Sequence, residues 1–145
     1  MTISKNWAIF LCDWRDHYEI TVGMKGTATI NVEREDTALE VGSGSLLVYA
    51  TPCMVALMEG AACDAIAEAL PEEKTSVGTE LNISHISATP VGMEVRADAE
   101  VTEVNGSIIT FSITAYDEAG KIGEGTHKRA VITTQRFLDK TYSKL

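Results

Sequence analysis

The residue in this sequence best suited to acid–base chemistry is Glu59. It lies in residues 51–70, TPCMVALMEGAACDAIAEAL, whose content of Ala, Leu and Met predicts a helix. Because a helix turns by ~100° per residue, apolar side chains such as Val55 and Ile66 fall within roughly 60° of Glu59. A carboxylate in the middle of an apolar helix face is costly unless it has partners or a function. Glu59 is therefore a candidate catalytic residue.

His85 is the second candidate, because it shares the apolar face of a predicted strand with Leu81 and Ile83. That face is expected to meet the helix, so Glu59 and His85 are predicted to face the same interior, as the titratable groups of active sites do. The alternative is that both are ordinary core residues with structural hydrogen-bond partners.

Thr51 and Gly78 each allow a structural and a functional interpretation. Thr51, followed by Pro52, is predicted to cap the helix. The N–H groups that converge at a helix start can also stabilise an anionic intermediate. Gly78 is either a bulge in its strand or a point where a ligand approaches the backbone.

A small cationic group stands near the end of the chain, in residues 125–132, GTHKRAVI. It contains His127, Lys128 and Arg129 in a chain whose formal net charge is −9. The group is either a solvated strand edge or a local anchor for a phosphate or carboxylate.

The composition limits the partners that this chain can have. Its negative charge argues against nucleic acid and against an anionic membrane, which both require a basic surface. No segment is long enough to span a membrane. Cys12, Cys53 and Cys63 form no CxxC pair, and their spacing predicts no metal site. Free thiols are typical of the reducing cytoplasm, where we expect the protein to be located.

Alternation of apolar and polar residues predicts one strand before the helix and four strands after it. The strands are expected at residues 22–32, 75–87, 91–104, 107–116 and 121–134. Asn105-Gly106 is a strong hairpin signal between two of them. Each strand has one apolar face, and the helix is the only large element available to cover it.

These elements predict the fold class and the domain organisation. The fold class is α+β, an antiparallel sheet wrapped around one long central helix, which is the hotdog arrangement. We expect residues 22–145 to form this single domain. Residues 1–21 are expected to form an N-terminal extension, either an arm or an amphipathic helix.

Three segments carry a resemblance to a known family: ATPCMVALMEGAACDAI at 50–66, SVGTELNISHISATPVGMEV at 76–95 and IGEGTHKRAVI at 122–132. They resemble the fluoroacetyl-CoA thioesterase family of hotdog proteins. The resemblance extends over about residues 22–137 and leaves the N-terminal extension uncovered.

The resemblance implies roles for five residues. Thr51, Glu59 and His85 stand in the family's order and spacing at its catalytic positions, so they are expected to be catalytic. Gly78 and Arg129 match positions that contact substrate in that family. The loop GSGSLLVY before Thr51 lacks the phenylalanines that gate the acyl pocket of the fluoroacetate-specific member. Another acyl group, or a broad range of them, is therefore expected.

The sequence and the resemblance together predict an acyl-CoA thioesterase that hydrolyses a short acyl-CoA to free acid and CoA. Glu59 would attack the thioester or activate water. No cofactor is expected beyond the CoA of the substrate. The resemblance also implies a homodimer, because a single hotdog sheet leaves an edge and a surface that dimers normally cover.

Two other classes compete with this prediction. The first is a non-catalytic protein of the same fold that binds acyl-CoA or another small ligand. The second is a hydratase or dehydratase, which would use an Asp–His pair near the helix, and residues 50–66 contain no such pair.

Overall fold

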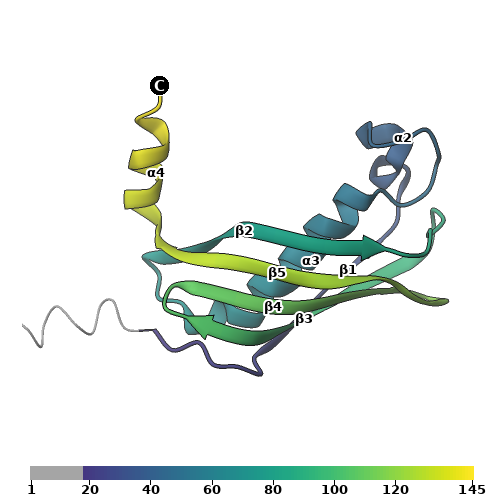
Figure 1. Ribbon diagram of the computed structural model, residues 1–145. Helices are drawn as coiled ribbons and strands as arrows, with labels where there is room; N and C mark the ends of the chain where they lie inside the picture. The colour runs from purple at the N-terminus through teal and green to yellow at the C-terminus, as the bar shows by residue number, and fades with distance from the viewer. Residues whose placement is uncertain (1–17) are drawn as a thin grey trace, which may run out of the picture.

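The structure, a computed structural model, describes residues 18–145, which form an antiparallel sheet curled around a long helix (Figure 1). The strands are β1 Lys25–Asn31, β2 Lys74–His85, β3 Glu94–Asn105, β4 Ile108–Asp117 and β5 Gly120–Thr133. The helices are α2 Ala38–Val41, α3 Thr51–Ile66 and α4 Thr134–Tyr142, and the 3-10 turns are η1 Arg34–Asp36 and η2 Ala67–Ala69. The predicted α+β arrangement is confirmed.

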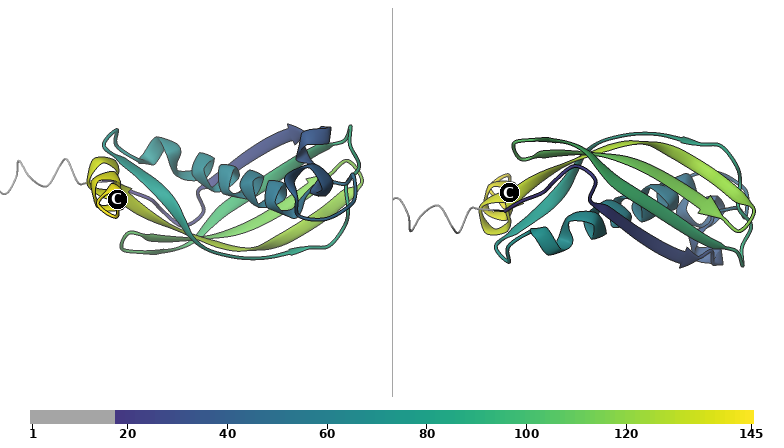
Figure 2. Two further views of the ribbon diagram at one scale, coloured as in Figure 1. Left: turned by 90° about the horizontal axis from the view of Figure 1, so that it is seen from above. Right: turned by 90° about the horizontal axis from the view of Figure 1, so that it is seen from below.

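The strand order in the sheet is β1-β3-β4-β5-β2, and every neighbouring pair is antiparallel. The turn at Gly106, where φ is +61°, joins β3 to β4, as the Asn-Gly pair predicts. After α3 the chain returns to the far side of the sheet, so β2 pairs with the last strand, β5. The strands β1 and β2 are therefore the two edges of the sheet, and Figure 2 shows the sheet curving around α3.

The buried face of α3 packs on the apolar faces of the central strands. Its fully or nearly fully buried residues are Met54, Leu57, Met58, Ala61, Ala62 and Ile66. Glu59 lies at the flank of this face, with 39% of its side chain exposed in the single chain. The prediction that Glu59 lies in the middle of the buried face was wrong, because the sheet contacts the neighbouring side of the helix.

The start of α3 also differs from the prediction. Ala50 occupies the N-cap position, and no side chain caps the helix. Thr51 is the first helical residue instead, and its hydroxyl is used elsewhere. The predicted capping role of Thr51 was therefore wrong, whereas Pro52 does lie in the first turn.

The edge strand β1 approaches α3 very closely at Gly26. A Cβ atom at this position would lie 2.2 Å from the backbone nitrogen of Ala65 and 2.3 Å from the carbonyl oxygen of Ala61. The next residue, Thr27, donates its backbone N–H to Asp64 Oδ2 at 3.0 Å. Only glycine allows this contact between strand and helix.

The predicted N-terminal extension, residues 1–21, lies mostly outside the described residues. Of its described part, Ile20 is buried in the core and Tyr18 packs against it. The division into an extension and a domain remains a prediction. Among residues 18–145, no helix is long and apolar enough to cross a membrane.

Candidate active site

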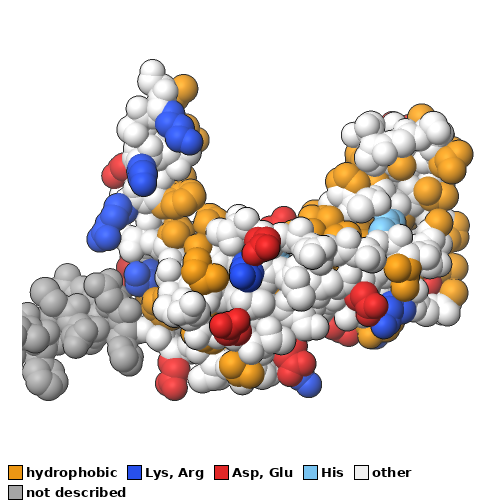
Figure 3. All heavy atoms as spheres, in the orientation of Figure 1, with side chains coloured by type: hydrophobic (Ala, Val, Ile, Leu, Met, Phe, Trp, Pro, Cys, Tyr) orange, Lys and Arg blue, Asp and Glu red, His pale blue; other side chains and the backbone are white. Residues whose placement is uncertain are grey.

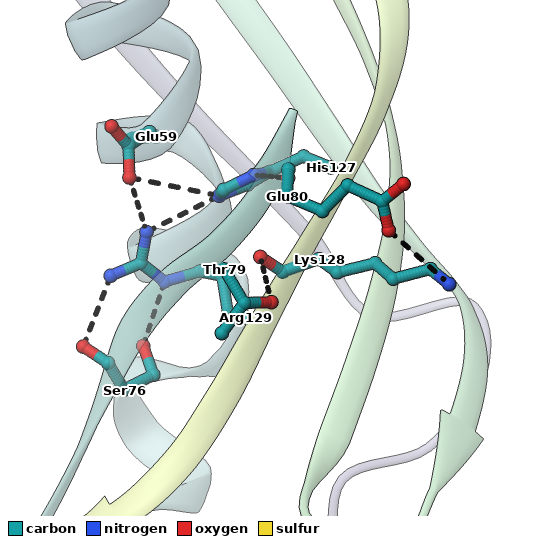
Figure 4. Close-up of polar contacts among 7 residues, drawn as sticks. All are labelled: Glu59, Ser76, Thr79, Glu80, His127, Lys128 and Arg129. Carbon is teal, nitrogen blue, oxygen red and sulfur yellow. Dashed lines mark hydrogen bonds and ion pairs between the residues drawn. The ribbon is translucent and has the colours of Figure 1, made fainter. Parts of the chain in front are cut away.

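Glu59 points from α3 toward β5, where Arg129 contacts it (Figure 4). Arg129 Nη1 donates to Glu59 Oε2 at 2.8 Å. The arginine side chain is only 7% exposed, so this charge-assisted pair is largely removed from water on its cationic side. The pair fixes the orientation of the Glu59 carboxylate.

The other nitrogens of Arg129 are bound by Ser76, which lies on the neighbouring strand β2. Nε donates to Ser76 Oγ at 2.8 Å, and Nη2 donates to the Ser76 carbonyl oxygen at 3.0 Å. Ser76 thus binds the guanidinium through Nε and Nη2, while Glu59 binds it through Nη1. A lysine ammonium could not reproduce this planar geometry. The Arg129 side chain faces the interior of the molecule, and its N–H groups donate to residues of its own chain.

His127 lies beside the pair and is almost fully buried. Its Nδ1 lies 2.8 Å from the Glu80 carbonyl oxygen, which can only accept, so Nδ1 carries the proton. Nε2 is then an acceptor for Arg129 Nη1 at 3.2 Å and lies 3.9 Å from Glu59 Oε2.

Burial lowers the pKa of His127, and the charge of Arg129 lowers it further. The Glu80 carbonyl and the Glu59 carboxylate oppose this shift but do not reverse it. The neutral imidazole is therefore the form that fits its two partners. Its ring also packs against Phe111, with the ring centroids 6.0 Å apart.

Gly78 lies directly against Glu59. The register between β2 and β5 shifts between Gly78 and Glu80, so the predicted bulge is present. A Cβ atom on Gly78 would lie 2.5 Å from Glu59 Oε2 and 3.3 Å from His127 Cε1. Because Gly78 has no side chain, the Glu59 carboxylate can lie directly against the Gly78 backbone.

His85 and Thr51 form a second pair, in which Oγ1 and Nδ1 share a hydrogen bond of 2.7 Å. It links the end of β2 to the first turn of α3. Burial lowers the pKa of His85, although the backbone of Ser87 opposes the shift. Both residues line an open pocket of about 270 Å³, and Ala38, Ser43 and Val48 form part of its wall.

The structure therefore divides the five predicted site residues into two groups. Glu59, Gly78 and Arg129 form one, and Thr51 and His85 form the other. Gly78 and His85 are seven positions apart along β2, which is roughly 20 Å of extended chain. The predicted pairing of Glu59 with His85 is not formed within one chain, because each side chain meets a different partner.

Two residues of the site were missed or misread from the sequence. Ser76 has no recognisable signal in the sequence, and His127 was predicted only as part of a cationic group, either a solvated edge or an anchor for a phosphate or carboxylate. Alternation along β5 was the available signal, since His127 and Arg129 share the inward face with buried Val131. Of the three residues of that group, Lys128 alone is exposed to solvent, on the outer face of the interior strand β5, where its Nζ lies 3.5 Å from Glu80 Oε2.

Comparisons with known proteins identify similar sequences and similar structures. Residues 32–135 match the model of a family described as fluoroacetyl-CoA-specific thioesterase. A fluoroacetyl-CoA thioesterase from Streptantibioticus cattleyicolor is 40% identical over 97 residues, which are 67% of this chain and 70% of that protein.

Solved structures extend the comparison to nearly the whole described chain. A structure of the fluoroacetyl-CoA thioesterase FlK has a TM-score of 0.82 at 33% identity, and covers 88% of this chain and 98% of its own. A thioesterase superfamily member from Thermus thermophilus has a TM-score of 0.76 at 26% identity, with coverages of 88% and 98%. A hot-dog-like protein from Thermanaerovibrio acidaminovorans, 23% identical with a TM-score of 0.78 over 87% of this chain and 93% of its own, shares the fold.

Proposed function

Since this chain belongs to the fluoroacetyl-CoA-specific thioesterase family, we propose that it hydrolyses short acyl-CoA thioesters to a free acid and CoA. The observation that carries the proposal is the Glu59 carboxylate, oriented by Arg129 and lying against a backbone with no side chain at Gly78. A thioester carbonyl can approach an acid placed in this way. Water is the second substrate, and CoA enters only as part of the first, so the reaction invokes no cofactor.

Glu59 acts on the thioester carbonyl in this proposal. It either attacks the carbonyl carbon, which gives an acyl anhydride that water then hydrolyses, or takes a proton from the attacking water. The backbone N–H of Gly78 donates to the carbonyl oxygen as negative charge develops there. His85, oriented by Thr51, delivers a proton to the departing CoA thiolate.

Arg129 has a positioning role rather than a role in binding CoA. The resemblance predicted contact with substrate, but Ser76, His127 and Glu59 accept from four of the five N–H donors of its guanidinium. His127 is a positioning residue as well, because its neutral Nε2 accepts from Arg129 Nη1.

A homodimer brings the two groups of site residues together. The edge of β2 is the longer of the two sheet edges and is unpaired in the described chain. Two identical edges related by a two-fold axis pair antiparallel. Pairing about Asn82, rather than about the midpoint of the strand, lays the His85 end of one β2 strand along the Gly78 bulge of its partner. Each active site then takes Thr51 and His85 from one subunit and Glu59 from the other.

The acyl group is expected to be small and not restricted to fluoroacetyl. The pocket beside Thr51 and His85 is walled by Ala38, Ser43 and Val48, and the loop before Thr51 contains no phenylalanine. The free thiols of Cys53 and Cys63 support a cytoplasmic location.

The test is release of free thiol from acetyl-, propionyl-, butyryl- and fluoroacetyl-CoA by the wild type, Glu59→Gln and His85→Ala. We expect turnover by the wild type and loss of it in both variants, with binding of acyl-CoA retained. A wild type that binds acyl-CoA without turnover would instead establish a non-catalytic binding protein.

Subunit mixing tests the shared site. Glu59→Gln and His85→Ala subunits, each inactive alone, are mixed under conditions that allow exchange. Half of the dimers are then mixed and contain one intact site, so activity returns to about a quarter of the wild-type value. A site built within one subunit would give no recovery.

A further inference from the structure

The C-terminal helix α4 stands away from the body of the molecule with an uncovered apolar side. None of its residues is buried. Phe137, Leu138 and Tyr142 are exposed, and at ~100° per residue they fall within roughly 140° on the helix. Figure 3 shows apolar side chains on the side of this helix that faces the hollow above β2. An isolated helix of nine residues is marginal in water, so this side requires a partner.

A second uncovered apolar surface lies on the opposite side of the same hollow (Figure 3). It belongs to residues 38–47, here called the 38–47 segment, and to the adjoining Ile86. Its exposed apolar residues are Leu39, Val41, Leu46, Leu47 and Ile86. Ala38 and Ser43 of this segment also form the wall of the pocket beside Thr51 and His85.

The charges of the C-terminal segment are opposite in sign to those of residues 33–47, which comprise the 38–47 segment and the turn η1 before it. The chain from residue 134 to its end contains three basic residues, Arg136, Lys140 and Lys144, against one acid, Asp139. Residues 33–47 contain four acids, Glu33, Glu35, Asp36 and Glu40, against one base, Arg34. Attraction between them would favour contact over separation.

Within one chain the two surfaces lie at opposite ends of β2. Lys74 at the start of β2 pairs with Thr133, directly before α4. His85 at its end lies beside the 38–47 segment, through the pocket that both line. An antiparallel pair of β2 strands places the start of one strand at the end of the other.

We propose that α4 of each subunit packs on the 38–47 segment of a second copy of this chain and so supports the wall of that copy's acyl pocket. This inference rests on the proposed dimer. With this contact, the partner subunit contributes three elements to each site: its β2 edge, Glu59 and α4. The apolar side of α4 covers the apolar surface of the 38–47 segment. The basic residues of α4 then face the acidic residues of the 33–40 stretch.

Disulfide trapping tests the contact without any use of catalysis. In a chain with Cys12, Cys53 and Cys63 replaced by Ser, Leu138→Cys is combined in turn with Leu39→Cys, Val41→Cys and Leu46→Cys. We expect a covalent dimer from at least one combination after mild oxidation. Asp139→Cys, which points about 100° away from Leu138 around the helix, is the matched control and should cross-link at least ten times less. Cross-links no stronger than this control, or formed within single chains, overturn the proposal.

Kinetics supply the second measurement. Leu138→Ser is expected to raise the KM for acetyl-CoA at least three-fold in protein that light scattering shows to be dimeric, whereas Asp139→Ser leaves it unchanged. A dimeric Leu138→Ser variant with wild-type KM would show that α4 does not support the pocket. A wild type that is dimeric but lacks turnover removes the proposed activity and leaves the trapping result to decide the packing.

Discussion

Arg129 and Glu59 form a pair in which Nη1 donates to Oε2 at 2.8 Å, while Ser76 binds the other two nitrogens of the guanidinium. The arginine is thereby a fixed part of the sheet, and the acid on the helix is oriented by it. A carboxylate that is aligned before substrate arrives loses little freedom in the reaction, which is the physical advantage of the arrangement.

Arg129→Lys should lower kcat rather than raise KM. An ammonium cannot bind Ser76 twice and Glu59 at once, so the carboxylate loses its orientation. We expect kcat for acetyl-CoA to fall roughly 10- to 100-fold. Steady-state kinetics separate this from a CoA anchor, for which KM would rise and kcat would stay close to wild type.

Gly78→Ala should abolish most activity without unfolding the protein. The new methyl group would lie 2.5 Å from Glu59 Oε2 and must displace the carboxylate. We expect a loss of roughly 100-fold in kcat/KM. Gly60→Ala is the matched control, because its Cβ would meet only the methyl group of Ala28 at 3.7 Å. Equal activity of the two variants would contradict the proposed role of Gly78.

Thr51→Val should remove activity and leave the helix intact. Valine has the shape of threonine but offers nothing to His85 Nδ1, so the imidazole loses its orienting partner. We expect kcat to fall on the order of 100-fold, with Thr51→Ser close to wild type. Because Thr51 does not cap α3, the thermal midpoint should change little. A marked drop in the midpoint of Thr51→Val would restore the capping interpretation.

Acid should destabilise the protein through His85 and His127. Burial lowers the folded-state pKa of both below the ordinary value of 6.5. The unfolded chain therefore binds more protons, and the free energy of unfolding falls as the pH drops through 6.5 toward the folded-state values. Urea unfolding at a series of pH values measures this slope.

His127→Phe tests the contribution of that imidazole. Phenylalanine cannot titrate, so the slope below pH 6.5 should become shallower. At neutral pH the variant should be less stable by about 1–3 kcal/mol, because the Glu80 carbonyl loses its donor. An unchanged slope would mean that His127 is not the buried neutral group described here.

Much of the fold was predictable from the sequence, because its strands alternate cleanly and Asn105-Gly106 marks one hairpin. The candidate site was only partly predictable. Alternation indicates which face of β2 carries His85, but it does not give the position of His85 along the helix axis. The predicted pairing of Glu59 with His85 is therefore not formed within one chain.

The contacts of Arg129 could not be predicted for a different reason. They depend on β2 lying next to β5, and these strands are separated in the chain by β3 and β4. No local pattern reports that neighbour. Only the capping role of Thr51 was predicted wrongly, because a threonine before a proline is a common capping signal. Its bond to His85 is again a contact distant in sequence.

The close contact at Gly26 sets the height of α3 above the sheet. Its Cα lies against the backbone of Ala61 and Ala65, which follow Glu59 by two and six residues on the same helix. A methyl group on Gly26 would push the helix away from the edge strand β1. We expect this shift to move Glu59 relative to Arg129, which lies on β5 near the opposite edge of the sheet. The distance between the Glu59 carboxylate and the Arg129 guanidinium thus depends on Gly26, which contacts neither of them. A screen for variants with altered turnover should therefore find substitutions in β1, far from the site.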